Sequence, residues 1–217
     1  LLHYLPSISD SFDPTMRYVL HPLNAENYKR DKVYTELNFK HQVFQTGTAE
    51  KFDNIAYVGN NIGDKTVYNN ALERISTTQS QFFSIITMQG HLPWGLIDSS
   101  ITAEGEGFTE SQNNDLLAYT WLLSNTDTAT REFLDSLQKI EKKITVVFYG
   151  DHLPGLYPSE VFLDNPDSQF RTEYFIWSNF ETPKLNYPLV NSSDFSALLF
   201  KQTNSKVSPY YALMTEY

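Results

Sequence analysis

The chain has 217 residues, of which 41% are hydrophobic and 15% aromatic, a composition that allows a globular fold with a sizeable core and excludes a disordered chain. Its formal net charge of −10 argues against general binding to nucleic acid or to anionic membrane surfaces. The absence of cysteine excludes disulfides and thiolate metal sites, and no apolar run reaches the roughly 18 residues that a membrane span needs.

The first third of the chain predicts short strands and one helix. MRYVLHP (16–22) is typical of a short strand that ends at a turn. Segment 24–39 has mixed polarity and is interpreted as a loop or a short helix, and segment 54–59 as a short strand or a loop. Apolar residues at helical spacing in 64–78 predict a helix with Asp64 as its N-cap.

The remaining two thirds alternate strand and helix patterns. QFFSIITMQ (81–89) is a continuous apolar run, which is typical of a strand buried on both faces. The longest helical pattern, 110–143, leads directly into a second such strand at 144–150. A third strand is predicted at 172–179 and a closing helix at 192–202.

This alternation predicts an α/β fold, a mostly parallel sheet with helices on both faces. Ligands of such sheets bind beyond the carboxyl ends of the strands. His21, His91 and His152 each fall at a predicted strand end, with a proline one or two positions later. A lone histidine in such a place is more often a turn residue or a satisfied core group, but three at one edge favour a shared site.

Asp151 and His152 form the most suggestive pair of neighbouring residues. Carboxylate and neutral imidazole are ligands of Zn²⁺ and Mn²⁺-type ions. Gly150 and Pro154 supply the sharp turn that would let adjacent residues reach one ion. The alternative is that Asp151 caps the following turn and His152 is simply exposed.

Arg30, in the segment YKRD, is a candidate for binding an anion. A guanidinium can clamp phosphate or sulfate oxygens with two parallel hydrogen bonds. The alternative is a solvated surface arginine beside Asp31. The glycine-containing stretch YVGNNIGD (57–64) matches no phosphate-loop spacing and is rejected as a nucleotide site.

Three segments carry a resemblance to a known family. TVVFYGDHLPGL (145–156) resembles the metal-binding segment of the sulfatase-like phosphoglycerol transferases of Gram-positive bacteria, the lipoteichoic acid synthase family of the alkaline phosphatase superfamily. FFSIITMQGHLPW (82–94) and YVLHPLNAENYKRDKVYTELNF (18–39) resemble two further segments of that family, in the same order along the chain. TEYFIWSN and SPYYALM also resemble its C-terminal part, so the likeness covers essentially the whole chain.

The resemblance implies a role for each matching residue. Asp151 and His152 would ligate a divalent metal, Mn²⁺ in this family, whereas His21, Arg30 and His91 would hold the phosphate and glycerol of the substrate. Tyr28 would stack on the glycerol, in place of the tryptophan that is common there. Two positions depart from the family pattern, because Lys29 replaces an asparagine and Asn38 replaces a glycine.

The resemblance also implies that residues 1–217 are one sulfatase-like domain without its N-terminal part. The family's threonine nucleophile and an acidic metal ligand would precede residue 1, so this fragment alone is expected to be inactive. Its parent would be anchored by upstream helices at the extracellular face of the cytoplasmic membrane. It would act on a phosphatidylglycerol-like headgroup and transfer phosphoglycerol to a cell-envelope glycolipid or polymer.

Two alternatives stay open at the level of the sequence. The first keeps the superfamily but changes the reaction, to phosphoethanolamine transfer or to sulfatase or phosphodiesterase hydrolysis. The second is a non-catalytic surface binding module, which an absent nucleophile would permit.

Overall fold

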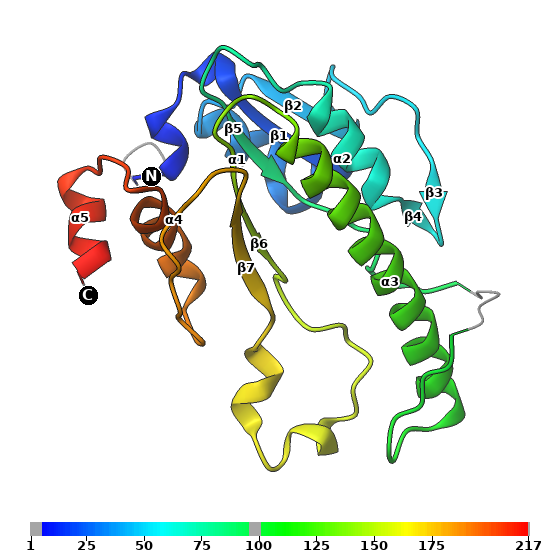
Figure 1. The fold of residues 1–217 in the computed structure, drawn as a ribbon. Helices are drawn as coiled ribbons and strands as arrows, with labels where there is room; N and C mark the ends of the chain where they lie inside the picture. Colours follow the sequence, from blue (N-terminus) through cyan, green and yellow to red (C-terminus); the bar gives the residue numbers. More distant parts are fainter. Residues whose placement is uncertain (1–5, 96–100, 217) are drawn as a thin grey trace. The chain divides into compact units, whose positions relative to one another are not determined.

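A parallel sheet of three strands forms the base of the larger of two compact units in this computed structural model. Its strand order is β2–β1–β5, with β1 spanning Arg17–Asn24, β2 His41–Thr46 and β5 Phe82–Ile85 (Figure 1). The structure describes residues 6–95 and 101–216. Residues 1–139 with 154–168 make the larger unit, and 140–153 with 169–217 make the smaller one.

The central strand β1 is the core of the larger unit, because its side chains alternate between two covered faces. Val19 packs with Phe39 and Phe44 in a buried cluster, and Tyr34 of α1 (Arg30–Glu36) covers it. The neighbouring Leu20 points to the opposite face and is also completely buried. Helix α2 (Asp64–Leu72) contacts both β1 and β5.

The long helix α3 (Glu110–Gln138) lies beside α2 (Figure 1). It begins at a capping box, in which Thr109 and Gln112 satisfy each other's backbone N–H groups. The rings of Tyr68 on α2 and Phe133 on α3 stack with their centroids 4.6 Å apart. A short antiparallel hairpin of β3 (Tyr57–Val58) and β4 (Asn61–Ile62) precedes α2.

The smaller unit is built on two antiparallel strands. β6 (Thr145–Tyr149) pairs with β7 (Tyr174–Ser178), and the rings of Phe148 and Phe175 stack across the pair at 4.9 Å. α4 (Phe195–Thr203) packs on β6, and α5 (Pro209–Glu216) packs on α4.

The predicted elements are confirmed in kind, with several corrections. The strand at 16–22, the helix within 64–78, the long helix and the closing helix all form. Strand β2 and helix α5 were not predicted, because HQVFQT has only two apolar residues and α5 is short. Asp64 is not the N-cap of α2; Gly63 is, and Asp64 is the first helical residue and is buried.

The expected burial of two strands on both faces is wrong. The side chains of β5 are half-buried, and those of β6 are half-buried or exposed. β5 lies at the edge of its sheet, and β6 pairs antiparallel in a sheet of two strands. A continuous apolar run does not specify how many layers cover it, so the sequence could not separate these cases.

Within the described residues, no helix combines the length and the apolar character required to cross a membrane.

The packing of β2 against β1 gives a first prediction. Phe44 is completely buried, so Phe44→Ala should lower the free energy of unfolding by about 3–5 kcal/mol, because it leaves a cavity in the core. Leu163→Ala, at a side chain that is 74% exposed, is the matched control and should change it by less than about 0.5 kcal/mol. Denaturant unfolding measures both, and equal losses would contradict this account of the core.

Candidate functional site

His21 is a buried histidine without a hydrogen-bond partner. It lies on β1, is 0% exposed, and neither ring nitrogen makes a hydrogen bond of normal geometry. Its ring meets the edge of Phe44 at 6.0 Å. Burial, with a smaller effect from the charge of Arg30, lowers the pKa of His21 to about 4, against a partial opposing effect of the nearby Ile86 backbone. The imidazole is therefore neutral at pH 7.

A strained turn brings Arg30 toward this imidazole. Tyr28 and Lys29 both have left-handed backbones, with φ of 55° and 56°, immediately before Arg30 starts α1. Consecutive left-handed residues other than glycine are costly, and such strain is concentrated at functional sites. The Arg30 guanidinium lies 4.9 Å from the centroid of the Tyr28 ring, which is 86% exposed. Arg30, Tyr28 and His21 thus form one local group.

His91 stands on an exposed turn that several side chains hold. The Asn61 side chain donates to the His91 carbonyl at 3.0 Å, and Asn60 donates to the Pro93 carbonyl at 2.9 Å. The Trp94 indole donates to the Gly90 carbonyl at 2.9 Å. The β3–β4 hairpin therefore fixes the outer side of the turn.

Gln89 fixes the inner side of the same turn, and this role was not predicted from the sequence. Its side-chain oxygen accepts from the Asp64 backbone N–H at 3.0 Å. Burial raises the pKa of Asp64, against the opposing effect of hydrogen bonds from Thr126, the Gln89 backbone and Thr87. A polar residue at the end of the apolar run 81–89 was the available signal.

Asp151 and His152 follow β6 in the smaller unit, and both are exposed. Their side chains are 81% and 64% accessible, and the His152 Nε2 lies 3.8 Å from the Asp151 Oδ2. The His152 backbone N–H donates to the Asp151 Oδ1 at 3.0 Å, so the turn holds the carboxylate beside the imidazole. This geometry is therefore compatible with both interpretations of Asp151, as a residue that caps the turn and as a metal ligand.

Each of the two His-Leu-Pro turns contains the same kind of hydrogen bond, from the histidine ring to the carbonyl of the next residue. The Nδ1 of His91 donates to the Leu92 carbonyl at 2.6 Å, and the Nδ1 of His152 donates to the Leu153 carbonyl at 2.8 Å. A carbonyl oxygen only accepts, so each Nδ1 carries the proton and the lone pair lies on Nε2. This tautomer is the one that a metal or a phosphate hydroxyl meets at Nε2.

The side chains of Asp151 and His152 have the right chemistry to supply two ligands to a divalent ion. Carboxylate oxygen and imidazole Nε2 suit Mn²⁺ or Zn²⁺, and the carbonyl bond at Nδ1 is the usual orienting contact of a metal-binding histidine. In the described parts of the chain, no three histidine and acidic side chains gather closely enough to hold a metal. Further ligands would have to come from elsewhere.

Comparison with known proteins decides the family. The family model for sulfatases matches residues 16–205. The chain belongs to the sulfatase family. Its α/β fold with a parallel sheet agrees with this membership, and the predicted alkaline phosphatase-like fold is confirmed.

Three solved structures resemble this sulfatase-family chain. Phosphoglycerol transferase GacH from Streptococcus pyogenes, in complex with sn-glycerol-1-phosphate, is 52% identical over 97% of this chain and 55% of its own, with a TM-score of 0.94. Lipoteichoic acid synthase LtaP from Listeria monocytogenes is 19% identical over 79% and 46%, with a TM-score of 0.56. An alkaline phosphatase superfamily protein from Vibrio parahaemolyticus is 16% identical over 92% and 49%, with a TM-score of 0.58.

The chain spans about half the length of these solved structures. The likeness to the last two establishes the fold. Within the chain, His21, Tyr28, Arg30 and His91 belong to the larger unit, and Asp151 and His152 belong to the smaller one.

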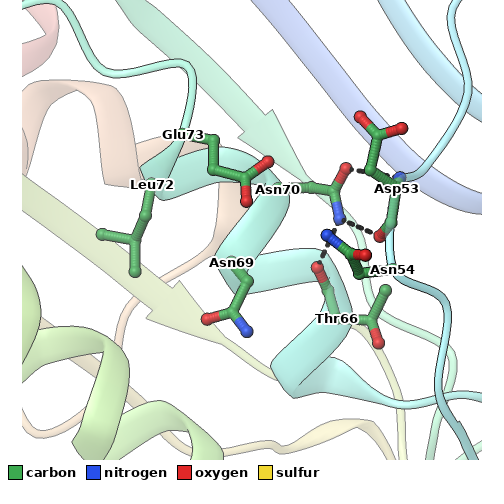
Figure 2. A pocket seen from close by; sticks show the side chains of 7 residues that line it. All are labelled: Asp53, Asn54, Thr66, Asn69, Asn70, Leu72 and Glu73. Carbon is green, nitrogen blue, oxygen red and sulfur yellow. Dashed lines mark hydrogen bonds between the residues drawn. The ribbon is translucent and has the colours of Figure 1, made fainter.

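A separate polar pocket in this sulfatase-family chain contains none of the predicted site residues (Figure 2). Asn70 closes it by donating to the Asp53 and Thr66 carbonyls, both at 2.9 Å, and by accepting from the Asp53 N–H at 3.0 Å. The carboxylates of Asp53 and Glu73 on its wall would repel a phosphate. The cavity of about 190 Å³ is lined by Asp53, Asn54, Thr66, Asn69, Asn70, Leu72 and Glu73.

The pKa of His21 gives a prediction for stability. The unfolded chain binds a proton at His21 near pH 6.5, whereas the folded chain does so only near pH 4. Folding is therefore disfavoured as pH falls from 6.5 to 4, by up to roughly 3 kcal/mol for this group alone. His21→Leu should remove that part of the pH dependence, and at pH 7 it should be at least as stable, since an unpaired buried imidazole is gone.

Denaturant unfolding of the two proteins between pH 4 and 7 tests this, with the difference between them isolating His21. Parallel stability curves for the two proteins would show that His21 is not buried as a neutral group.

Proposed function

We propose that the protein containing this chain is a metal-dependent transferase that moves phosphoglycerol from a phosphatidylglycerol-like headgroup to a cell-envelope glycolipid or polymer. The observation that carries the proposal is the 52% identity to a phosphoglycerol transferase, GacH, over 97% of this chain. The local group of His21, Tyr28 and Arg30 supports it, because an unpaired imidazole beside a guanidinium suits a phosphoester.

In this proposal Arg30 binds the phosphate and Tyr28 stacks on the glycerol. A guanidinium supplies paired donors for two phosphate oxygens and stabilises the charge that develops during transfer. Neutral His21 is completely buried in this structure, so in this proposal the side chains around it move aside before a ring N–H donates to the substrate, which would satisfy the hydrogen-bonding capacity that burial leaves unused. His91 offers a further contact through Nε2, which accepts from a glycerol hydroxyl, since the Nδ1 proton is committed to the Leu92 carbonyl.

Asp151 and His152 hold the divalent ion in this proposal, and Mn²⁺ is the ion that we favour. When bound, such an ion stabilises negative charge on phosphate and lowers the pKa of a bound hydroxyl. The residues of this chain contribute by orientation, because the Leu153 carbonyl fixes the His152 tautomer and the His152 N–H fixes the carboxylate of Asp151. In this proposal the attacking threonine and the membrane anchor are supplied from outside this chain, and the catalytic domain faces the extracellular side.

The role of Arg30 is tested by turnover of the full-length protein. Release of diacylglycerol from phosphatidylglycerol vesicles should fall by about 10–100-fold in Arg30→Ala, which loses a charge-assisted contact. Arg131→Ala is the matched control, because Arg131 is an exposed arginine that pairs with Asp127 on α3, and it should change the rate by less than about twofold.

The same assay separates the alternative reactions. Headgroup loss from phosphatidylethanolamine in place of phosphatidylglycerol would replace the proposal by phosphoethanolamine transfer. Release of free glycerol phosphate to water, with no product on an acceptor, would indicate hydrolysis. No turnover of any of these lipids by the full-length protein would favour a binding module.

The metal assignment is tested by calorimetry. Asp151→Asn and His152→Gln should each weaken Mn²⁺ binding to the full-length protein by at least about tenfold, because each removes one ligand. Asp164→Asn, at another exposed aspartate, is the control and should leave the affinity unchanged. Unaltered Mn²⁺ affinity in both ligand variants would defeat the assignment.

A further inference from the structure

Gln89 connects the turn that carries His91 to two helices at once. It lies between β5 and His91 and is 2% exposed. Its side-chain oxygen accepts from the Asp64 N–H, the first residue of α2, at 3.0 Å. Its side-chain nitrogen donates to the Leu122 carbonyl of α3 at 3.0 Å and to the Thr126 hydroxyl at 3.1 Å.

The side chains of Asp64 and Thr126 close this network. The Thr126 hydroxyl donates to the Asp64 Oδ2 at 2.7 Å, and the Gln89 backbone N–H lies 3.4 Å from the Asp64 Oδ1. Asp64 is 1% exposed, so the network is shielded from water, which strengthens its hydrogen bonds. A buried amide with all its polar atoms paired defines one position for the backbone that carries it.

The network acts on the His91 turn because Gln89 is part of that turn. The His91 N–H donates to the Met88 carbonyl at 3.0 Å, so residues 88–91 form one tight turn with Gln89 inside it. Asn60 and Asn61 hold the turn from its exposed side, with bonds that water can replace. Gln89 is its anchor on the buried side.

We propose that Gln89 is a positioning residue, which Asp64 and Thr126 hold so that the turn presents the Nε2 of His91 to the phosphoglycerol substrate. The inference rests on the proposed function, since it takes His91 as a substrate contact. Displacement of a catalytic group by about 1 Å can cost on the order of 100-fold in rate. If these hydrogen bonds only joined α2 to α3, they would need no partner in the His91 turn.

The helix α3 offers a matched pair of variants. Thr126→Val removes hydroxyl contacts to Asp64 and Gln89, whereas Thr130→Val removes the 3.2 Å contact between the Thr130 hydroxyl and the Tyr68 hydroxyl of α2. Both changes keep side-chain shape, both lie in the α2–α3 interface one helical turn apart, and only the first reaches the His91 turn. Gln89→Met is the stronger form of the first change.

Activity of the full-length protein on phosphatidylglycerol vesicles gives the first readout. We expect a loss of about 10–100-fold in Gln89→Met and about 3–10-fold in Thr126→Val. Thr130→Val should lose less than about twofold for a similar fall in thermal midpoint. Equal losses in the two threonine variants would overturn the proposal and leave a network with a structural role alone.

The state of the His91 ring gives a second readout that needs no activity. In ¹⁵N-histidine NMR spectra, with the His91 signal assigned by a His91→Gln variant, the wild-type ring should be protonated at Nδ1. Because the Leu92 carbonyl sets this tautomer locally, Gln89→Met should keep it but change the chemical shifts of the His91 ring as the turn moves, while His152 serves as an internal reference that stays unchanged. An unaltered His91 signal overturns the positioning role, and a shifted signal without lipid turnover in the wild type would fault the proposed function alone.

Discussion

The chemistry proposed for the larger unit depends on the burial of His21 inside the sheet. An imidazole that is 0% exposed and has no hydrogen-bond partner costs stability, because burial takes its two polar atoms from water without replacement. An apolar side chain of similar size would pack against Phe44 without that cost. A group that is costly to the fold but suited to a ligand is what a binding site requires, since the ligand then supplies the missing partner.

The backbone close to His21 also gives up stability at a candidate binding residue. Two left-handed residues, Tyr28 and Lys29, precede α1 and orient Arg30 so that its charge acts on His21. Asparagine tolerates this conformation better than lysine does, so Lys29 makes the turn more strained than the asparagine of the family pattern would. Strain at Tyr28 and Lys29 and the unpaired polar atoms of His21 are thus concentrated within ten residues of the sequence.

The sequence predicted an element correctly where a local pattern of apolar and polar residues was typical of one kind of secondary structure. MRYVLHP and the helical spacing of 110–143 predicted β1 and α3. His152 lies three positions after β6, close to the predicted strand end, but β5 ends at Ile85, six positions before His91. The prediction that His21 ends a strand is wrong, because β1 continues to Asn24. Half-burial of β5 was not predictable, because apolar runs look alike at an edge and in a centre. The role of Gln89 was also hidden, since its three partners lie on α2 and α3, between 25 and 37 positions away. Long-range hydrogen bonds leave no local pattern.

The His-Leu-Pro sequence occurs twice and forms the same local hydrogen bond in both places, although different contacts anchor the two turns. In both copies the histidine Nδ1 donates to the carbonyl of the following leucine, so the tautomer is set within two residues. What differs is the connection to the rest of each unit: Gln89 anchors the first turn to two helices, whereas the second follows β6, where the Gly150 N–H donates to the Glu173 carbonyl at 3.1 Å. The sequence motif therefore determines which ring nitrogen presents its lone pair, and the buried contacts of each unit determine where that nitrogen lies.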